Sequence, residues 1–541
     1  MKRRQVLQNA ALTTYALPSL LLSSCQKNFS AEKITKDPAQ AAIGFELDEM
    51  SIDQLRQMME AGALTSRRIV ELYLQRIQTI DQQGIALKSV IEINPDALTI
   101  AAQRDEEREN GRVRGWLHGI PFLIKDNIDT ADNMMTTAGS LALSGHRAKN
   151  DAPIVEQLRN AGAVLLGKTN LSEWANFRST RSSSGWSSRG GQTKNPYSLE
   201  RNPCGSSSGS GVAVAANLCS FAIGTETNGS ISCPASINGI VGLKPTVGLL
   251  SRRGIIPISK TQDTAGPMTR TVKDAAMVLS AITAFDAKDE IILKRTEDLP
   301  SDYTSFLNEE ALQGKRIGVE KSFLKVHEKV DMLLQSALDQ MRSKGAVIVE
   351  VDFVSRLKEI GDNEYKVLQF EFKDGLNRYL AGTDSSVKSL KQVIAFNNEH
   401  ADQVMPFFRQ EILEASEARA DLDSQEYKNA LNNVLTTSRQ AIDGLMKEHQ
   451  LDALCGPATG PAWCTDVVNG DSFSGYGMGS GAAMAGYPSI TVPLGEAHGL
   501  PVGLLFIAGA YAEADLLAMA YAYEQSSHNR KAPSFRARTG S

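Results

Sequence analysis

Segments with helical periodicity and short apolar runs typical of strands are both present along the chain, as an α/β fold requires. Hydrophobic residues make up 42% of the 541 residues, which is ordinary for a globular protein with a sizeable core. The length alone would suggest three or four domains. However, no Pro-rich, charged or low-complexity stretch divides the chain after residue 45, so the composition marks no domain boundary there.

Helices and strands alternate in the first third of the predicted fold. The pattern Ser51-Ile-Asp-Gln54 is a capping box that opens a helix, which Gly62 ends. Thr65-Ser66 caps a second helix, in which apolar residues recur at helical spacing. The elements that follow are a strand at 89–93, a helix at 95–110, a strand at 120–124, a helix at 153–160 and a strand at 163–166.

The second half of the chain is predicted to contain a charged, helical region and a final pair of strands. From residue 286 to 451, only KRIGVE and AVIVEVDF have the pattern of strands. The helices expected in this region lie at 330–344, at 365–380 and within 402–448. The segments GYPSITVPLG and LPVGLLFIAG are then predicted as paired strands, followed by a helix at 513–525.

The stretch from Pro203 to Pro245 is the predicted functional site. It opens with CGSSSGSG, and such small residues let the backbone approach another backbone or a ligand closely. A flexible Gly/Ser linker is the alternative interpretation. The apolar run at 212–218 and the ending IVGLKP, which is typical of a buried strand stopped by proline, argue against a linker.

Two serines in this stretch, Ser206 and Ser230, are candidate nucleophiles. A serine hydroxyl needs a base to remove its proton, and none of the 7 histidines lies inside the stretch. A lysine can serve as the base where burial lowers its pKa towards neutrality. Lys125 ends the apolar strand at 120–124, so its side chain should start inside the core. An exposed lysine is the ordinary alternative.

Three motifs together resemble the amidase signature family: IPFLIKDN resembles its lysine strand, CGSSSGSG its first serine loop and GTETNGSI its nucleophile loop. The similarity covers roughly Leu47 to Glu524 and is strongest to the bacterial peptide amidase branch. The resemblance implies that Ser230 is the acylated nucleophile, that Ser206 is a bridging serine in a cis peptide, and that Lys125 is the base.

The same resemblance implies a fold and a reaction. The fold would be a single large mixed β-sheet wrapped by helices over residues 46–541, with helices at about 286–450 shaping the substrate entrance. The reaction would be hydrolysis of a carboxamide, most closely a C-terminal peptide amide, to the acid and ammonia through an acyl-enzyme, without metal or organic cofactor. Ser207 and Asp263 would be supporting residues. The oxyanion hole would consist of the backbone N–H groups of Thr227, Asn228, Gly229 and Ser230.

Three positions depart from the commoner pattern of the family. Glu226 stands where Asp is usual, Asn228 where Gly is usual and Ser232 where Arg is usual. The peptide amidase branch shows similar departures, so we interpret them as characteristic of a subfamily.

Two further segments match the residue patterns of other enzyme classes but lack the secondary structure that those patterns require. Residues 162–169 fit the Walker A pattern, but a phosphate loop needs a strand before its first glycine, and here the strand lies between the two glycines. Residues 205–209 fit the G-x-S-x-G pattern with Ser207 as nucleophile. That pattern should follow a hydrophobic strand, and RNPCG precedes it instead.

Charge and cysteine content exclude some functions. A formal net charge of −5 argues against a nucleic acid partner, which would require a basic face. None of the 6 cysteines has the spacing of a zinc site. Small buried thiols explain Cys204, Cys219 and Cys233, whereas Cys455 and Cys464 bracket a short loop and could form a disulfide.

The N-terminus is predicted to be an export signal. Residues 1–25 combine a basic start, an apolar run too short to span a bilayer, and LSSC, which resembles a lipobox with Cys25 as the lipidated residue. Arg3-Arg4 resembles a twin-arginine signal. Residues 26–45 would be a flexible tether. The expectation is a periplasmic or membrane-anchored bacterial lipoprotein, and release after cleavage beyond Cys25 is the alternative.

Other functions remain open from the sequence. The chain could hydrolyse other small aliphatic or aryl amides, or act as an amidotransferase subunit with a partner chain. A catalytically silent binding protein is a further alternative, against which the intact set of Lys125, Ser206 and Ser230 argues. The oligomeric state is not readable from the sequence.

Overall fold

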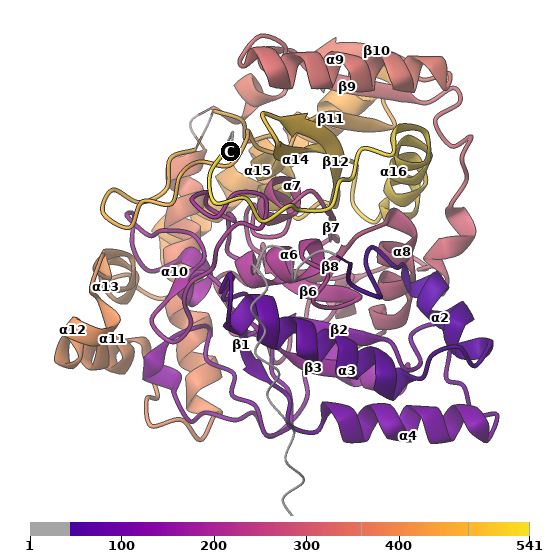
Figure 1. The fold of residues 1–541 in the computed structure, drawn as a ribbon. Coiled ribbons are helices and arrows are strands. Elements are labelled where there is room, and N and C mark those ends of the chain that lie inside the picture. Colours follow the sequence, from indigo (N-terminus) through magenta and orange to yellow (C-terminus); the bar gives the residue numbers. More distant parts are fainter. Residues whose placement is uncertain (1–43, 359, 474, 540–541) are drawn as a thin grey trace, which may run out of the picture. The chain divides into compact units, whose positions relative to one another are not determined.

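An eleven-stranded mixed β-sheet forms the centre of the computed structural model, which describes residues 44–539 except 359 and 474. The strand order is β1-β3-β2-β6-β8-β7-β12-β13-β11-β9-β10, from the lower end of Figure 1 to its upper end. The strands are β1 (Val90–Ile93), β2 (Pro121–Lys125), β3 (Val164–Thr169), β6 (Phe221–Glu226), β7 (Val241–Lys244), β8 (Thr264–Thr269), β9 (Arg316–Glu320), β10 (Val347–Val351), β11 (Ala453–Pro457), β12 (Ser489–Ala497) and β13 (Leu500–Ile507). The short strands β4 (Trp186–Ser187) and β5 (Gly191–Gln192) pair separately.

Parallel pairing joins the two strands on which the predicted site depends. β2 runs parallel to β6, with Phe122 opposite Phe221 and Ile124 opposite Ile223. The rings of Phe122 and Phe221 stack at a centroid distance of 5.2 Å, and both are fully buried. Because parallel neighbours end at the same edge of a sheet, the residues that follow β2 and β6 are brought together.

Helices surround the sheet (Figure 1). Those of the first half are α2 (Ile52–Glu60), α3 (Ser66–Arg76), α4 (Ala97–Glu109), α5 (Pro153–Asn160), α6 (Ser208–Ala215), α7 (Ser232–Ile237) and α8 (Val272–Ile282). Those of the second half are α9 (Glu328–Ser343), α10 (Gly361–Ala381), α11 (Leu390–Glu399), α12 (Ala401–Val404), α13 (Glu411–Glu417), α14 (Gln425–His449), α15 (Gly479–Ala485) and α16 (Glu513–Ser527).

Part of the helical region predicted at about 286–450, from α10 to α13, lies together at one side of the domain. Figure 1 shows α10 to α13 grouped at the left, away from α16. Two small apolar clusters hold these helices: one joins α10, α11 and α13, and the other joins α10 to α14. Within 402–448 the structure has three helices. The first of them, α12, ends just before Pro406, because a proline disfavours helical geometry at the residue that precedes it.

The predicted α/β fold with a single large mixed sheet is confirmed. Ser51 and Gln54 form the expected capping box of α2, and β12 and β13 pair in antiparallel fashion as predicted. The predicted export signal at 1–25 and all but the last two residues of the tether lie outside the described residues. No helix in the described part of the chain is both long and apolar enough to cross a membrane.

Candidate active site

Lys125 is the last residue of β2, and its side chain is completely buried. Its Nζ lies 2.7 Å from the Oγ of Ser206. The amine also donates to the Oγ1 of Thr225 at 2.8 Å and to the Thr225 carbonyl oxygen at 3.2 Å. Asn127 donates to the same Oγ1 at 3.1 Å. Thr225, on the neighbouring strand β6, therefore fixes the amine next to Ser206, a contact that the sequence motifs did not reveal.

Burial lowers the pKa of the Lys125 amine to about 7. The carboxylates of Asp263 and Glu226 oppose this effect, because a negative charge favours the protonated amine. A substantial fraction of the amine is therefore neutral near pH 7, with a lone pair that can accept a proton.

Ser206 and Ser207 connect the first serine loop to β6 and to the second serine loop. The peptide bond between Gly205 and Ser206 is cis, as the family resemblance implies. The N–H of Ser207 donates to the carbonyl oxygen of Ser230 at 3.2 Å. The Ser207 hydroxyl donates to the Thr225 carbonyl oxygen at 3.0 Å and accepts from the Thr225 N–H at 3.2 Å. The hydrogen bonds of Ser207 thus stabilise the loop, and its hydroxyl is fully engaged with the backbone of Thr225.

Ser230 is the accessible member of the predicted triad. It is 8% exposed, whereas Lys125 and Ser206 are 0% exposed. The neighbouring Gly229 has a φ of +85°, which favours glycine, and a Cβ placed there would meet no atom within 4 Å. The second serine loop therefore borders open space at this point, where a substrate could approach Ser230.

The four backbone N–H groups predicted to form the oxyanion hole are free of internal partners. Among the described residues, none of them donates a hydrogen bond to another group. The residues concerned are Thr227, Asn228, Gly229 and Ser230. Unpaired amides beside an accessible serine are the donors that an oxyanion requires.

Two of the departures from the family pattern contact each other. The Oε2 of Glu226 accepts hydrogen bonds from the N–H groups of Ile231 and Ser232 at 2.7 and 2.9 Å, and from the Ser232 hydroxyl at 3.2 Å. Glu226 precedes the second serine loop and the other two residues follow it. The side chain of Glu226 therefore closes the loop that carries Ser230.

Asp263 supports the same loop from the residue before β8. Its Oδ1 accepts from the Thr227 hydroxyl at 2.5 Å, and its Oδ2 accepts from the N–H groups of Ile258 and Ser259, both at 2.8 Å. Burial raises the pKa of Asp263 to about 6. The carboxyl group is therefore mostly ionised at pH 7, where its charge favours the protonated form of Lys125.

A disulfide joins the two serine loops, and this corrects the cysteine assignment made from the sequence. Cys204 and Cys233 are bonded, whereas Cys455 and Cys464 are free thiols. Cys455 is buried inside β11, and Cys464 is exposed in a loop that bridges to Arg201. The proximity of Cys455 and Cys464 in sequence was therefore misleading.

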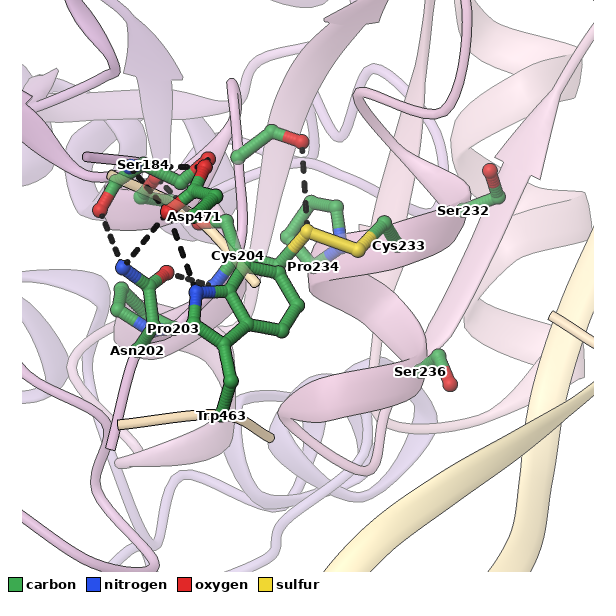
Figure 2. The surroundings of a disulfide bond; sticks show 12 residues. Ser184, Asn202, Pro203, Cys204, Ser232, Cys233, Pro234, Ser236, Trp463 and Asp471 are labelled. Carbon is green, nitrogen blue, oxygen red and sulfur yellow. Dashed lines mark hydrogen bonds between the residues drawn. A yellow bond between two sulfur atoms is a disulfide. The ribbon is translucent and has the colours of Figure 1, made fainter. Parts of the chain in front are cut away.

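Figure 2 shows how this disulfide is surrounded. Trp463 packs in a small apolar cluster with Cys204 and Cys233, and its Nε1 donates to Asp471 at 3.1 Å. The Asp471 carboxylate also accepts from the Ser184 N–H at 3.0 Å. Neighbouring side chains thus surround the disulfide at the start of the first serine loop.

Replacing both cysteines of the disulfide with serine is expected to lower the free energy of unfolding by about 3 kcal/mol, because the bond restrains a loop of roughly 30 residues in the unfolded chain. The change in the midpoint of thermal unfolding measures the effect. A reducing agent should lower the midpoint of the wild-type protein and leave the Cys204→Ser/Cys233→Ser variant unchanged. Equal midpoints for the wild-type protein and the variant would contradict the structural role.

The structure explains why residues 162–169, which fit the Walker A pattern, do not form a phosphate loop. Gly167 and Lys168 lie inside β3, and a Cβ on Gly167 would come within 2.3 Å of the Glu92 carbonyl oxygen on β1. The buried amine of Lys168 donates to Ile128 and Thr136. The glycine therefore permits close strand pairing. Within the part of the chain that the structure describes, no group of three or more His, Cys, Asp or Glu side chains is placed to hold a metal ion.

Comparison with known proteins identifies the class to which this fold and site belong. The Amidase family profile matches residues 68–517, so the chain belongs to the amidase family. The native peptide amidase from Stenotrophomonas maltophilia has a solved structure that is 50% identical, with a TM-score of 0.87 over 90% of this chain and 99% of that chain. The protein is therefore an amide hydrolase of the amidase signature type, structurally close to peptide amidase.

Relatives from other organisms extend this comparison. A probable amidase of Arabidopsis thaliana is 41% identical over 501 residues, covering 91% of this chain and 92% of the relative. A Schizosaccharomyces pombe protein described as an amidase is 39% identical, covering 90% and 87%. A glutamyl-tRNA(Gln) amidotransferase subunit of Thermoanaerobacter pseudethanolicus is 33% identical, covering 89% and 97%.

These relatives correct the localisation predicted from the N-terminus. The two amidases with 41% and 39% identity come from a plant and a fission yeast, so the prediction of an exported bacterial lipoprotein anchored through Cys25 is wrong. The basic start, apolar run and LSSC form a short compositional pattern. That pattern carries less information than similarity over about 500 residues.

Proposed function

We propose that this amidase hydrolyses C-terminal peptide amides to the acid and ammonia through Lys125, Ser206 and Ser230. The single observation that carries the proposal is the 2.7 Å separation between the buried Lys125 Nζ and the Ser206 Oγ, next to the loop that holds the accessible Ser230. The structural similarity to peptide amidase supports the choice of substrate class.

The reaction would proceed by acyl transfer. Neutral Lys125 accepts the proton of Ser206 while Ser206 takes the proton of Ser230, and the Ser230 oxygen attacks the amide carbon. The tetrahedral intermediate collapses as its nitrogen receives a proton through the same path and leaves as ammonia. Water then repeats the sequence on the acyl-enzyme and releases the carboxylic acid.

The oxyanion of each tetrahedral intermediate would be stabilised by the free N–H groups of residues 227–230. Each such donor contributes roughly 3 kcal/mol to transition-state stabilisation in comparable sites. Glu226 and Asp263 hold the two ends of this loop, so their role in the proposal is to position the donors. We further propose that the substrate is a small-molecule or peptide amide and not a nucleic acid, in line with the net charge of −5.

A panel of amides tests the substrate class. Release of ammonia is measured from a peptide amide, an aliphatic amide and an aryl amide at equal concentrations. The expected result is a kcat/KM for the peptide amide at least about tenfold above the other two, which corresponds to about 1.4 kcal/mol of transition-state binding. A preference for the aliphatic or aryl amide would retain the mechanism and overturn the proposed substrate.

The amidotransferase relative defines a second candidate function, in which ammonia is passed to a partner chain. The observation in its favour is the 33% identity to an amidotransferase subunit over 89% of this chain. The purified chain alone is expected to release ammonia and acid in equal amounts from a peptide amide. Hydrolysis that requires a copurifying partner chain would favour the second function.

A further inference from the structure

We propose that Glu364 is a positioning residue that sets the geometry of the oxyanion loop from helix α10. The inference rests on the proposed function of residues 227–230, and it adds a side chain that lies more than 130 positions away in the sequence. Glu364 occupies the first turn of α10, within the helical region predicted at about 286–450.

One carboxyl oxygen of Glu364 accepts hydrogen bonds from two side-chain amides, each of which belongs to a loop of the candidate active site. Its Oε1 accepts from the Nδ2 of Asn228 at 2.7 Å and from the Nε2 of Gln262 at 2.9 Å. Gln262 is 1% exposed and also donates to the carbonyl oxygen of Thr227 at 3.3 Å. The two amides therefore tie Thr227 and Asn228, the first two members of the oxyanion loop, to a single carboxyl group.

The Asn228 side chain is fixed at its other end as well. Its Oδ1 accepts from the hydroxyl of Ser480, on α15, at 3.1 Å. The bond to Glu364 is the shorter of the two, at 2.7 Å against 3.1 Å, so we take it as the stronger anchor. Asn228 replaces the glycine usual in the family, and this contact gives the replacement a physical role.

The expected consequence is catalytic and not merely structural. Backbone N–H groups stabilise an oxyanion only when they point at the position that the charge will occupy. A displacement of about 1 Å in such a group can lower the rate about 100-fold while the substrate still binds. Loss of the Glu364 anchor should therefore reduce kcat and leave KM nearly unchanged.

The test compares Glu364→Ala with a matched control on the same helix turn. Asp362 is exposed in the first turn of α10, so Asp362→Ala removes a carboxyl group from the same helix turn without touching the oxyanion loop. For a peptide amide, Glu364→Ala is expected to lower kcat about 10- to 100-fold and to change KM less than about threefold. Asp362→Ala should behave as the wild-type protein, and Glu364→Gln, whose side-chain oxygen still accepts, should recover most of kcat.

A double-mutant cycle shows whether Glu364 acts through the loop. If it does, Glu364→Ala combined with Asn228→Ala should lose little more kcat than the larger single change, because the two substitutions break the same contact. Fully additive losses, or a Glu364→Ala variant with wild-type kcat, would overturn the inference.

A second readout separates this inference from the proposed function. A fluorophosphonate reacts with an activated serine and places a phosphoryl oxygen where the oxyanion would lie. Its labelling rate can be measured whether or not any amide is turned over. Slower labelling of Glu364→Ala at an unchanged thermal midpoint supports the positioning role even if no peptide amide is hydrolysed, and an unchanged rate overturns that role even if the amide is hydrolysed.

Discussion

Ser230→Ala is expected to abolish amide hydrolysis, with kcat reduced at least about 1,000-fold, because loss of a nucleophile removes the acyl-enzyme route altogether. Ser230 is the member of the predicted triad that keeps some exposed surface, and the adjacent Gly229 borders open space. Ammonia release measures the effect. Fluorophosphonate labelling followed by mass spectrometry should place the label on the peptide that contains Ser230.

The control for this experiment is a serine outside the site. Ser305 is exposed, and Ser305→Ala should keep both hydrolysis and labelling. Residual activity of Ser230→Ala above about a tenth of the wild-type rate would remove Ser230 from the mechanism. A label on Ser207 would instead revive the nucleophile suggested by the G-x-S-x-G letters.

Lys125→Met is expected to lower kcat/KM about 100- to 10,000-fold, the usual contribution of a general base. The wild-type kcat/KM should rise with pH through an apparent pKa near 7, because the amine must lose its proton before it can accept one from Ser206. The variant should lack this rising limb. Initial rates between about pH 5.5 and 9 measure both effects.

The second buried lysine supplies a matched control. Lys168 on the neighbouring strand β3 is also 0% exposed, but its amine contacts Ile128 and Thr136 and not a candidate nucleophile. Lys168→Met should retain the rising limb when rates are corrected for the folded fraction. A Lys125→Met variant that is active with an unshifted pH profile would contradict the assignment of the base.

Lys125 should also impose a cost on stability that its removal reveals. The pKa is 10.5 in the unfolded chain and about 7 in the folded protein, so the unfolded chain binds more protons between these values. The free energy of unfolding therefore rises with pH across this window, and the full cost is present below it. Lys125→Met is expected to lose this rise, so its free energy of unfolding should change less between about pH 7 and about pH 10 than that of the wild-type protein. An equal rise in the variant and the wild-type protein would contradict this expectation.

Local sequence was sufficient for the features that short motifs encode. The apolar run before Lys125 predicted a buried strand, and the small residues around Ser206 and Ser230 predicted close-packed loops. Both predictions depend on residues adjacent in the chain, where propensity and spacing act directly. Such reasoning did not predict that the strand ending at Lys125 and the two serine loops lie together in space. That prediction came from the family resemblance.

Contacts between distant segments were missed for a physical reason. The partners Cys204 and Cys233 are 29 residues apart, and nothing in the intervening sequence reports the 6.1 Å between their Cα atoms. The contact between Glu364 and Asn228 spans 136 residues. Glu364 lies in a helical segment that contains many charged residues. Nothing in the local sequence therefore distinguishes it from its exposed neighbours or indicates its hydrogen bond to Asn228.

The carboxylate on α10 limits how this enzyme could be recombined with its relatives. Helices without contacts to the loop that carries Ser230 could be exchanged freely, because Lys125 lies on β2 and Ser230 lies between β6 and α7. In this protein the helices reach into the catalytic loops through Glu364 and Ser480. A chimera that imports foreign helices without these two anchors is therefore expected to lose rate, whichever amides its new helices accept.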